Sequence, residues 1–252
     1  MPGPFRGGVT LAVAMFTVVP LHARRIDRPA AAVALAVVPV VGVLLGALLG
    51  AGAAGLVAAG APGLLAGLVA VGLGAAATRG LHLDGLADLA DGLGSHGDAE
   101  RTLAVMRDPG TGAFAVIWLV VVLGIQATAF GALAERGVLA AAVGAALALG
   151  LGRAAFAWVA RRGVPAASPD GLGALVAGTQ PAWRAPVWAV VLAGAAFPVL
   201  GLGAVIATLL AAVSVVLVAA HARRRLGGVS GDVFGACAEL AATVALAALA
   251  IA

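Results

Sequence analysis

The run AAAVALAVVPVVGVLLGALLGAGAAGLVAA, residues 30–59, contains no charged residue and decides the fold class of this chain. A helix needs about 20 apolar residues to cross a hydrocarbon layer about 30 Å thick, so this run is long enough to span a membrane. Its richness in Ala and Leu, without alternation of polar and apolar residues, indicates a helix rather than a barrel strand. The glycines at positions 42, 46 and 50 predict a face on which a second helix packs closely.

The same character extends along the whole chain. Of 252 residues, 63% are hydrophobic and 10% are charged, whereas soluble domains carry about 25% charged residues. We therefore predict an all-α, polytopic membrane helical bundle of about seven (six to eight) transmembrane helices, with residues 1–252 forming a single integral membrane domain. The expected spans are 30–59, 62–81, 113–134, 138–160, 186–200, 201–220 and 233–252, and the run 5–19 is short for a span.

The basic residues predict which side of the membrane each connection faces. All of them are Arg, and they are scattered without interleaved aromatic residues, which argues against a nucleic-acid partner. Alternate connections contain Arg at 24–28, 101–107, 161–162 and 223–225, while the opposite connections contain only Arg136. Because basic loops stay in the cytoplasm, the polar stretches are expected on the cytoplasmic side. A lone cysteine, Cys237, excludes an internal disulfide.

An acidic stretch interrupts this apolar sequence between residues 79 and 112. It holds six of the eleven acidic residues, namely Asp84, Asp88, Asp91, Asp98, Glu100 and Asp108. On a helix, the first three lie within about 60° of one another, and Gly85 and Gly92 lie on a flank where another backbone can approach. Carboxylates so close repel one another, and a divalent cation such as Mg²⁺ would relieve the repulsion. The alternative is a solvated face paired with Arg79, Arg101 or Arg107.

Other polar residues are candidates for the same site. The turn MRDPGTG, residues 106–112, precedes an apolar helix whose N-terminus could bind an anion together with Arg107, although a plain turn reads the same way. His82 precedes the aspartates and points away from them in an ideal helix. In the last span, Asp232 and Glu239 share nearly the same face. A buried Glu239 needs a partner, either a metal or Arg153, and a purely structural Arg153–Glu239 pair is the simpler alternative.

Three motifs carry a resemblance to a known family. HLDGLADLADGL (82–93), MRDPGTGAF (106–114) and RRLGGVSGDVFGACAEL (224–240), with the early FTVVP (16–20), resemble cobalamin synthase, the adenosylcobinamide-GDP ribazoletransferase family. Two positions depart from the family pattern. Ser230 replaces a more usual Thr, and Ser168 stands where the pattern has Arg, for which Arg153, Arg161 or Arg162 could substitute.

The resemblance implies a reaction and a site. It implies that the 5′-oxygen of α-ribazole, or of α-ribazole 5′-phosphate, attacks adenosylcobinamide-GDP and releases GMP, in a Mg²⁺-dependent enzyme of the prokaryotic cytoplasmic (inner) membrane whose site faces the cytoplasm. The implied catalytic residues are Asp84, Asp88, Asp91 and Asp108, with Asp84, Asp88 and Asp91 on the metal and Asp88 or Asp91 as the base. The implied substrate-binding residues are His82, Arg101, Arg107, Arg153, Ser230, Asp232 and Glu239. The lipid bilayer is an expected partner, and a homo-oligomer is left open.

Two other functions compete with this interpretation. A CDP-alcohol phosphotransferase also uses clustered aspartates on membrane helices, but its motif contains an Arg and a spacing that DGLADLADG lacks. An ion-coupled transporter would carry acids at the bilayer midplane in paired repeats. Here the acids gather at one end of the expected spans, and no internal repeat is evident.

Overall fold

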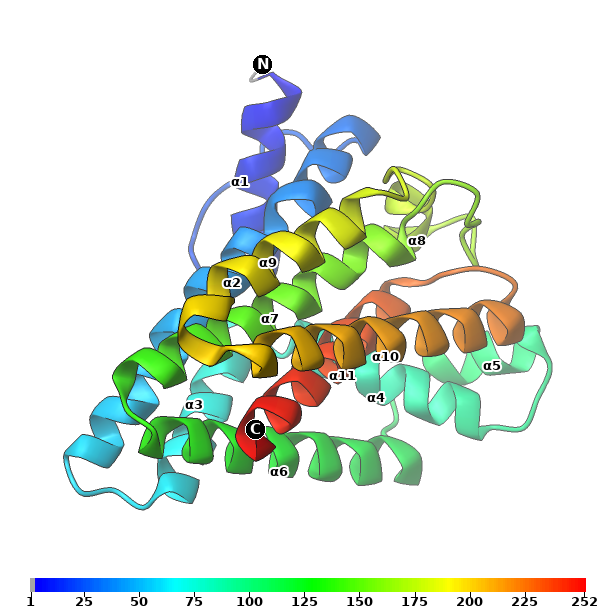
Figure 1. The fold of residues 1–252 in the computed structure, drawn as a ribbon. Helices are drawn as coiled ribbons and strands as arrows, with labels where there is room; N and C mark the ends of the chain where they lie inside the picture. The colour runs from blue at the N-terminus through cyan, green and yellow to red at the C-terminus, as the bar shows by residue number, and fades with distance from the viewer. Residues whose placement is uncertain (1–2) are drawn as a thin grey trace.

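The structure, a computed structural model, describes residues 3–252 as a bundle of helices (Figure 1). Two isolated bridges, Arg161 with Gln180 and Ala166 with Val229, are the only β-type pairings in that range. The all-α prediction is therefore confirmed. The helices are α1 (Pro4–Phe16), α2 (Arg28–Ala58), α3 (Gly63–Ala77), α4 (Leu81–Gly94), α5 (Ala99–Met106), α6 (Ala113–Glu135), α7 (Val138–Val159), α8 (Gly171–Val176), α9 (Arg184–Leu200), α10 (Leu202–Leu226) and α11 (Gly231–Ile251).

Five helices, α2, α6, α7, α10 and α11, are long and apolar enough to cross a membrane. Helices α3 and α4 would form a sixth span if they counted as one, but they meet at an angle of 93°. The expected span 186–200 becomes the shorter apolar helix α9, and the run 5–19, which is short for a span, becomes the shorter apolar helix α1. With five or six long spans and two short apolar helices, the expected number of about seven is close to the observed architecture.

The bend between α3 and α4 breaks the expected span 62–81. Arg79 and Gly80 have φ angles of 55° and 66°, which a right-handed helix does not contain. The guanidinium of Arg79 donates hydrogen bonds of 3.0 Å to the carbonyl oxygens of Ala14 and Met15 at the end of α1. Arg79 therefore anchors the bend to α1 and does not pair with the aspartates that follow it.

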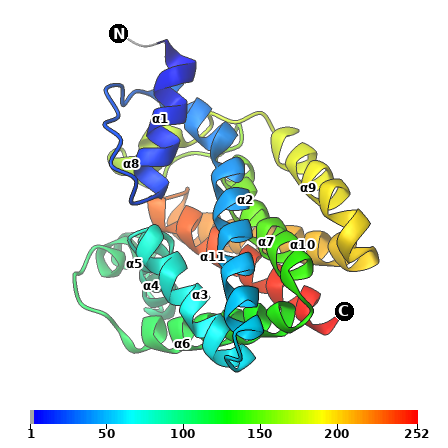
Figure 2. The ribbon, with the colours of Figure 1, turned by 90° about the vertical axis from the view of Figure 1, so that its left-hand side faces the viewer.

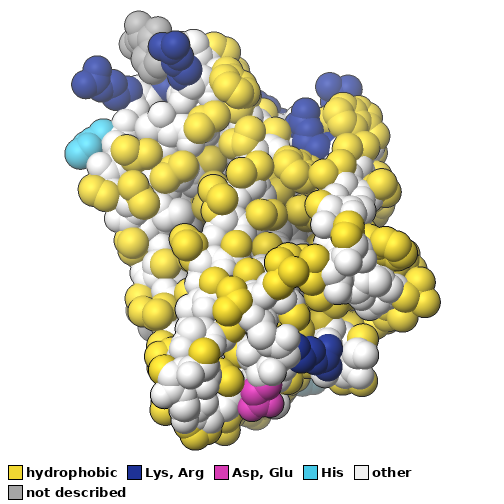
Figure 3. All heavy atoms as spheres, turned by 60° about the vertical axis from the view of Figure 1, so that its left-hand side comes forward, with side chains coloured by type: hydrophobic (Ala, Val, Ile, Leu, Met, Phe, Trp, Pro, Cys, Tyr) yellow, Lys and Arg dark blue, Asp and Glu magenta, His cyan; other side chains and the backbone are white. Residues whose placement is uncertain are grey.

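The polar connections gather at one end of the bundle (Figure 1). The short α2–α3, α6–α7 and α9–α10 connections lie at the opposite end, together with the C-terminus. Helices α5 and α8 and the α10–α11 connection lie at the polar end. The middle of the face drawn in Figure 3 is covered by hydrophobic side chains, and outward-facing residues such as Leu48, Val120 and Val190 are at least 66% exposed. This distribution is that of an integral membrane protein.

Helices α2 and α7 lie side by side through the centre of the bundle (Figures 1 and 2). Every fourth residue on the facing side of α2 is the Gly predicted for close packing. A Cβ atom at Gly42 would lie 2.5 Å from the carbonyl oxygen of Leu149, and one at Gly46 would overlap the carbonyl group of Ala145. The two backbones therefore touch directly, as the glycine spacing predicts.

This contact yields a stability prediction. Gly46→Leu should lower the unfolding free energy in detergent by about 1–3 kcal/mol, the usual cost of overpacking, because its side chain must push α7 away. Gly52→Leu on the same helix is the matched control, since a Cβ there meets no atom within 4 Å. Thermal unfolding of both variants checks the prediction. Equal loss of stability in the two would contradict the close α2–α7 contact.

Candidate active site between α4 and α11

Helices α4 and α11 cross at two glycines. A Cβ at Gly85 would lie 2.9 Å from the Cα atom of Asp232, and a Cβ at Gly235 would lie 2.9 Å from the carbonyl oxygen of His82. The flank expected beside Gly85 is therefore where α11 approaches. Because side chains are absent at the crossing, Asp232 in the first turn of α11 comes next to the acidic face of α4.

The acidic side chains of this region lie close enough for their negative charges to repel one another. The pKa of Asp88 is raised to about 6, chiefly by burial and then by the negative charges of Asp84, Asp232 and Asp91, in that order of importance. Among residues 3–252 the only ion pair within 4.0 Å joins Arg25 and Asp27. The pairing of these carboxylates with Arg79, Arg101 or Arg107, which the alternative required, is therefore not seen.

Asp91 has a structural role that the spacing did not reveal. Its carboxylate accepts hydrogen bonds from the backbone N–H groups of Gly112, at 2.6 Å, and Ala115, at 2.9 Å. Asp91 thus caps the N-terminus of α6 and ties the 107–112 loop to α4. The helix N-terminus that we expected to bind a substrate anion is bound by this side chain. Both Asp91 oxygens are engaged, so Asp84 and Asp88 are better placed than Asp91 to bind a metal.

The remaining candidates of the 98–112 segment lie at its surface. Arg101, Arg107 and Asp108 are exposed. Asp108 accepts a hydrogen bond from the N–H of Gly110 at 2.9 Å, which closes a local turn. Arg107 donates to the hydroxyl of Ser168 at 3.1 Å. Arg107 therefore places its charge beside Ser168, the position at which the resemblance predicts an arginine.

Two of the three arginines that could substitute at Ser168 are directed elsewhere. Arg161 stacks 4.3 Å from the ring centre of Trp158, and the side chain of Arg153 contacts His82 inside the bundle. The substitution predicted for Arg153 or Arg161 is therefore not seen, and Arg107 is the arginine that contacts Ser168.

The GGVSGD stretch before α11 is shaped by packing. Val229 and Ala166 form a bridge, and a Cβ at Gly228 would overlap the backbone of Ala166 and Ala167. Ser230 precedes the first turn of α11, and its hydroxyl donates to the carboxylate of Asp232 at 3.1 Å. Close packing against the backbone of residues 166–167 therefore requires a glycine at 228, and Ser230 orients Asp232.

Glu239 lies deeper in α11 and is bound by a residue that sequence reasoning missed. The amide of Gln126 on α6 donates to the carboxylate of Glu239 and to the hydroxyl of Thr243, both at 2.9 Å. No ion pair within 4.0 Å joins Arg153 to Glu239 among the described residues, so the alternative of a purely structural Arg153–Glu239 pair is not seen. The two side chains instead border a cavity of about 40 Å³, which is large enough for water.

The Gln126 contact predicts a stability effect. Gln126→Leu should destabilise the protein by about 1–3 kcal/mol, because Glu239 and Thr243 lose their donor in a buried setting. Thr128→Val on the same helix is the control, since the Thr128 hydroxyl is exposed. Chemical unfolding in detergent measures both. A Gln126→Leu variant as stable as Thr128→Val would show that the buried carboxylate does not need this amide.

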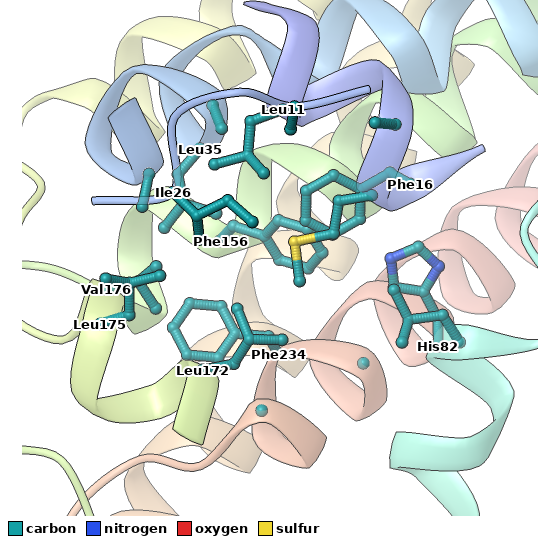
Figure 4. A pocket seen from close by; sticks show the side chains of 18 of the residues that line it. Leu11, Phe16, Ile26, Leu35, His82, Phe156, Leu172, Leu175, Val176 and Phe234 are labelled. Carbon is teal, nitrogen blue, oxygen red and sulfur yellow. The ribbon is translucent and has the colours of Figure 1, made fainter. Parts of the chain in front are cut away.

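A cavity of about 600 Å³ opens beside the carboxylates (Figure 4). Asp84 and Asp232 form part of its wall, and most of the remainder is apolar. Phe16, Phe156 and Phe234 come from α1, α7 and α11, and His82 comes from α4. Residues far apart in the sequence therefore build one apolar compartment with an acidic edge.

The carboxylates fit a magnesium ion only together with other ligands. Within the part of the chain that the structure describes, no three His, Cys, Asp or Glu side chains are arranged to hold a metal by themselves. Mg²⁺ commonly takes one or two carboxylates and completes its shell with water and substrate phosphates. Asp84 and Asp88, which repel each other without a partner, fit that kind of site.

The fold and the site define an integral membrane protein with an acidic site beside an apolar cavity at one end of its helical bundle. Residues 8–250 match the family model described as cobalamin-5-phosphate synthase, and the chain belongs to that family.

Curated relatives extend over most of the chain. A protein of Nocardioides sp. named adenosylcobinamide-GDP ribazoletransferase is 39% identical over 93% of this chain and 94% of its own length. Proteins of the same name from Pseudomonas aeruginosa, 36% identical over 84% of both chains, and Corynebacterium efficiens, 35% identical over 94% of this chain and 88% of its own, are also similar. No solved structure matches.

Proposed function

We propose that this chain is an adenosylcobinamide-GDP ribazoletransferase, which joins adenosylcobinamide phosphate to α-ribazole or its 5′-phosphate and releases GMP. Its family and the names of its relatives support this activity. The observation that carries the proposal is the crossing of α4 and α11, which places Asp84 and Asp232 at one edge of a ligand-sized cavity, with Asp88 near enough to feel the charges of both. In the reaction, a ribose oxygen forms a bond to the phosphorus next to cobinamide, and the bond from that phosphorus to the GMP oxygen breaks.

The family description identifies a constraint on the nucleophile. A cobalamin 5-phosphate retains a phosphate on the 5′-oxygen of its ribose. That oxygen cannot then be the atom that attacks, so we propose that another ribose hydroxyl is the nucleophile. This replaces the 5′-oxygen that the resemblance implied.

Each polar side chain of the site would have its own role in the reaction. Asp84 and Asp88 would hold Mg²⁺ together with the substrate pyrophosphate, and the metal would supply charge neutralisation for the leaving GMP. Asp232, oriented by Ser230, faces them from α11. Arg107, exposed beside Ser168, is available to bind a phosphate oxygen through a charge-assisted hydrogen bond. Asp91 would hold the 107–112 loop in place, and because both its oxygens are bonded, Asp88 is the better candidate for the base.

We also propose that the polar end of the bundle faces the cytoplasm of a prokaryotic cell. The Arg residues of the connections at 24–28, 161–162 and 223–225 support this orientation, because basic residues near span ends remain in the cytoplasm. A nucleotide-linked substrate would then reach the acidic edge from the compartment that contains nucleotides.

The test is a transfer assay with the purified, folded protein in detergent. Adenosylcobinamide-GDP, α-ribazole and Mg²⁺ are mixed with it, and GMP and a cobalamin product are measured by chromatography. We expect both products in equal amounts, and none after EDTA treatment until Mg²⁺ is restored. Absence of GMP with folded protein would overturn the activity. Full activity in EDTA would overturn the magnesium dependence alone.

A further inference from the structure

The wall of the 600 Å³ cavity contains a cluster of aromatic rings. The rings of Phe16 and His82 are stacked with centres 5.7 Å apart and planes 4° from parallel. Phe156 lies 5.4 Å from Phe16 and 5.6 Å from Phe234. Figure 4 shows these side chains around one space, with Leu172, Leu175 and Val176 of α8 on another side. Such a wall suits a flat aromatic ligand, which stacks or packs edge-on against phenylalanines.

His82 adds one polar group to this wall. Its side chain is 2% exposed, and its Nδ1 atom lies 3.2 Å from Nη2 of Arg153. A guanidinium can only donate, so Nδ1 must accept, and the proton of the neutral imidazole is on Nε2. That Nε2 atom is the only buried side-chain nitrogen or oxygen without a hydrogen-bond partner among residues 3–252. His82 thus lines the cavity, and the Nε2 atom of its side chain is a buried donor that no protein group satisfies.

An unsatisfied buried donor is costly, and a site built to donate to a ligand atom leaves this donor free until the ligand binds. The complementary group is an acceptor nitrogen in a flat aromatic ring. A cavity of about 600 Å³ lies within the range of about 300–1,000 Å³ that small-molecule sites occupy. Asp84 and Asp232 border the same cavity, so a sugar attached to such a ring would lie next to the carboxylates.

We propose that this cavity is the subsite for the benzimidazole base of α-ribazole, with the phenylalanines packing against the ring and Nε2 of His82 donating to its unsubstituted nitrogen. The assignment rests on the proposed function and specifies where the acceptor substrate binds. Adenosylcobinamide-GDP then approaches the acidic edge from outside the cavity. His82 is, in this arrangement, a residue that recognises the base and takes no part in the transfer itself.

The hydrogen bond can be tested in the wild-type protein with a changed substrate. In an indole riboside, a C–H group replaces the acceptor nitrogen of the base while the ring shape is retained. We expect its KM to be about 10-fold higher than that of α-ribazole, the size of one buried hydrogen bond, with the KM for adenosylcobinamide-GDP unchanged. Equal KM values for the two acceptors would overturn the role of His82.

Substitutions in the cavity wall then test where the benzimidazole ring binds. In His82→Phe, the KM for α-ribazole should rise about 10-fold, and the indole analogue should bind no worse than α-ribazole does. Phe234→Leu should raise the KM for α-ribazole alone, whereas Phe130→Leu, a buried phenylalanine that does not line this cavity, should not change it. If the KM for adenosylcobinamide-GDP rose instead while GMP was still released, the cavity would bind adenosylcobinamide-GDP rather than α-ribazole, and the inference would be overturned. Absence of GMP in the wild type would instead contradict the proposed function.

Discussion

Replacing Asp84 or Asp88 by Asn should lower the rate of GMP release by about 10²- to 10³-fold, the typical loss when one preorganised electrostatic contact to a transition state is removed. Each amide keeps the size of the side chain but removes the charge that would bind Mg²⁺ against the substrate pyrophosphate. The folded state should not suffer, because the carboxylates repel one another and burial already disfavours the ionised form of Asp88. Single-turnover measurement of GMP, with thermal unfolding in parallel, checks both expectations.

Glu100→Gln is the matched control for these variants. Glu100 belongs to the same acidic stretch but is exposed on α5, away from the crossing of α4 and α11. Its rate should remain within about twofold of wild type, as for most changes at exposed positions without special contacts. If Asp84→Asn and Asp88→Asn retained the rate of Glu100→Gln, the acidic face of α4 would not be the reaction centre.

The second large effect is expected from Gly85→Ala. A Cβ at this position would lie 2.9 Å from the Cα atom and 3.0 Å from the carbonyl oxygen of Asp232, so the added methyl group must separate α4 from α11. A displacement of about 1 Å can cost about 10²-fold in rate when it moves reacting groups apart. We expect a loss of that order in GMP release. The protein should be destabilised only modestly, because Ala favours the helix more than Gly does and so offsets part of the cost of separating the helices.

Gly72→Ala is the comparison for this variant. Gly72 is exposed on α3, and a Cβ there meets no atom within 4 Å, so activity should be retained and stability should be equal or slightly higher. Full activity in Gly85→Ala would show that the close approach of α4 and α11 is not needed for the reaction.

The sequence predicted the parts of this fold that depend on periodic patterns. The apolar run 30–59 became α2, its glycine stripe became the α7 contact, and Asp84, Asp88 and Asp91 were placed on one helix. The flank at Gly85 was also predicted as a place of close approach. These features follow from local spacing, which a single sequence contains.

Other features depend on contacts between distant segments, which spacing does not reveal. The 93° bend is held by hydrogen bonds from Arg79 to α1, and Asp91 accepts a hydrogen bond at the start of α6. Gln126, which binds Glu239, is the only amide or charged residue in the apolar run 113–134 and could have been noticed for that reason. The aromatic cavity could not have been predicted, since Phe16, Phe156 and Phe234 follow no common pattern.

The position of the bound pyrophosphate locates the reaction centre of this protein most directly. A cryo-EM structure of the protein, enlarged by a bound antibody fragment, would be determined with Mg²⁺ and an adenosylcobinamide-GDP analogue whose pyrophosphate cannot be cleaved. We expect the pyrophosphate to lie at the crossing of α4 and α11, facing Asp84, Asp88 and Asp232. A pyrophosphate bound elsewhere, for instance beside Arg161 and Arg162 with the acidic face of α4 empty, would contradict this expectation.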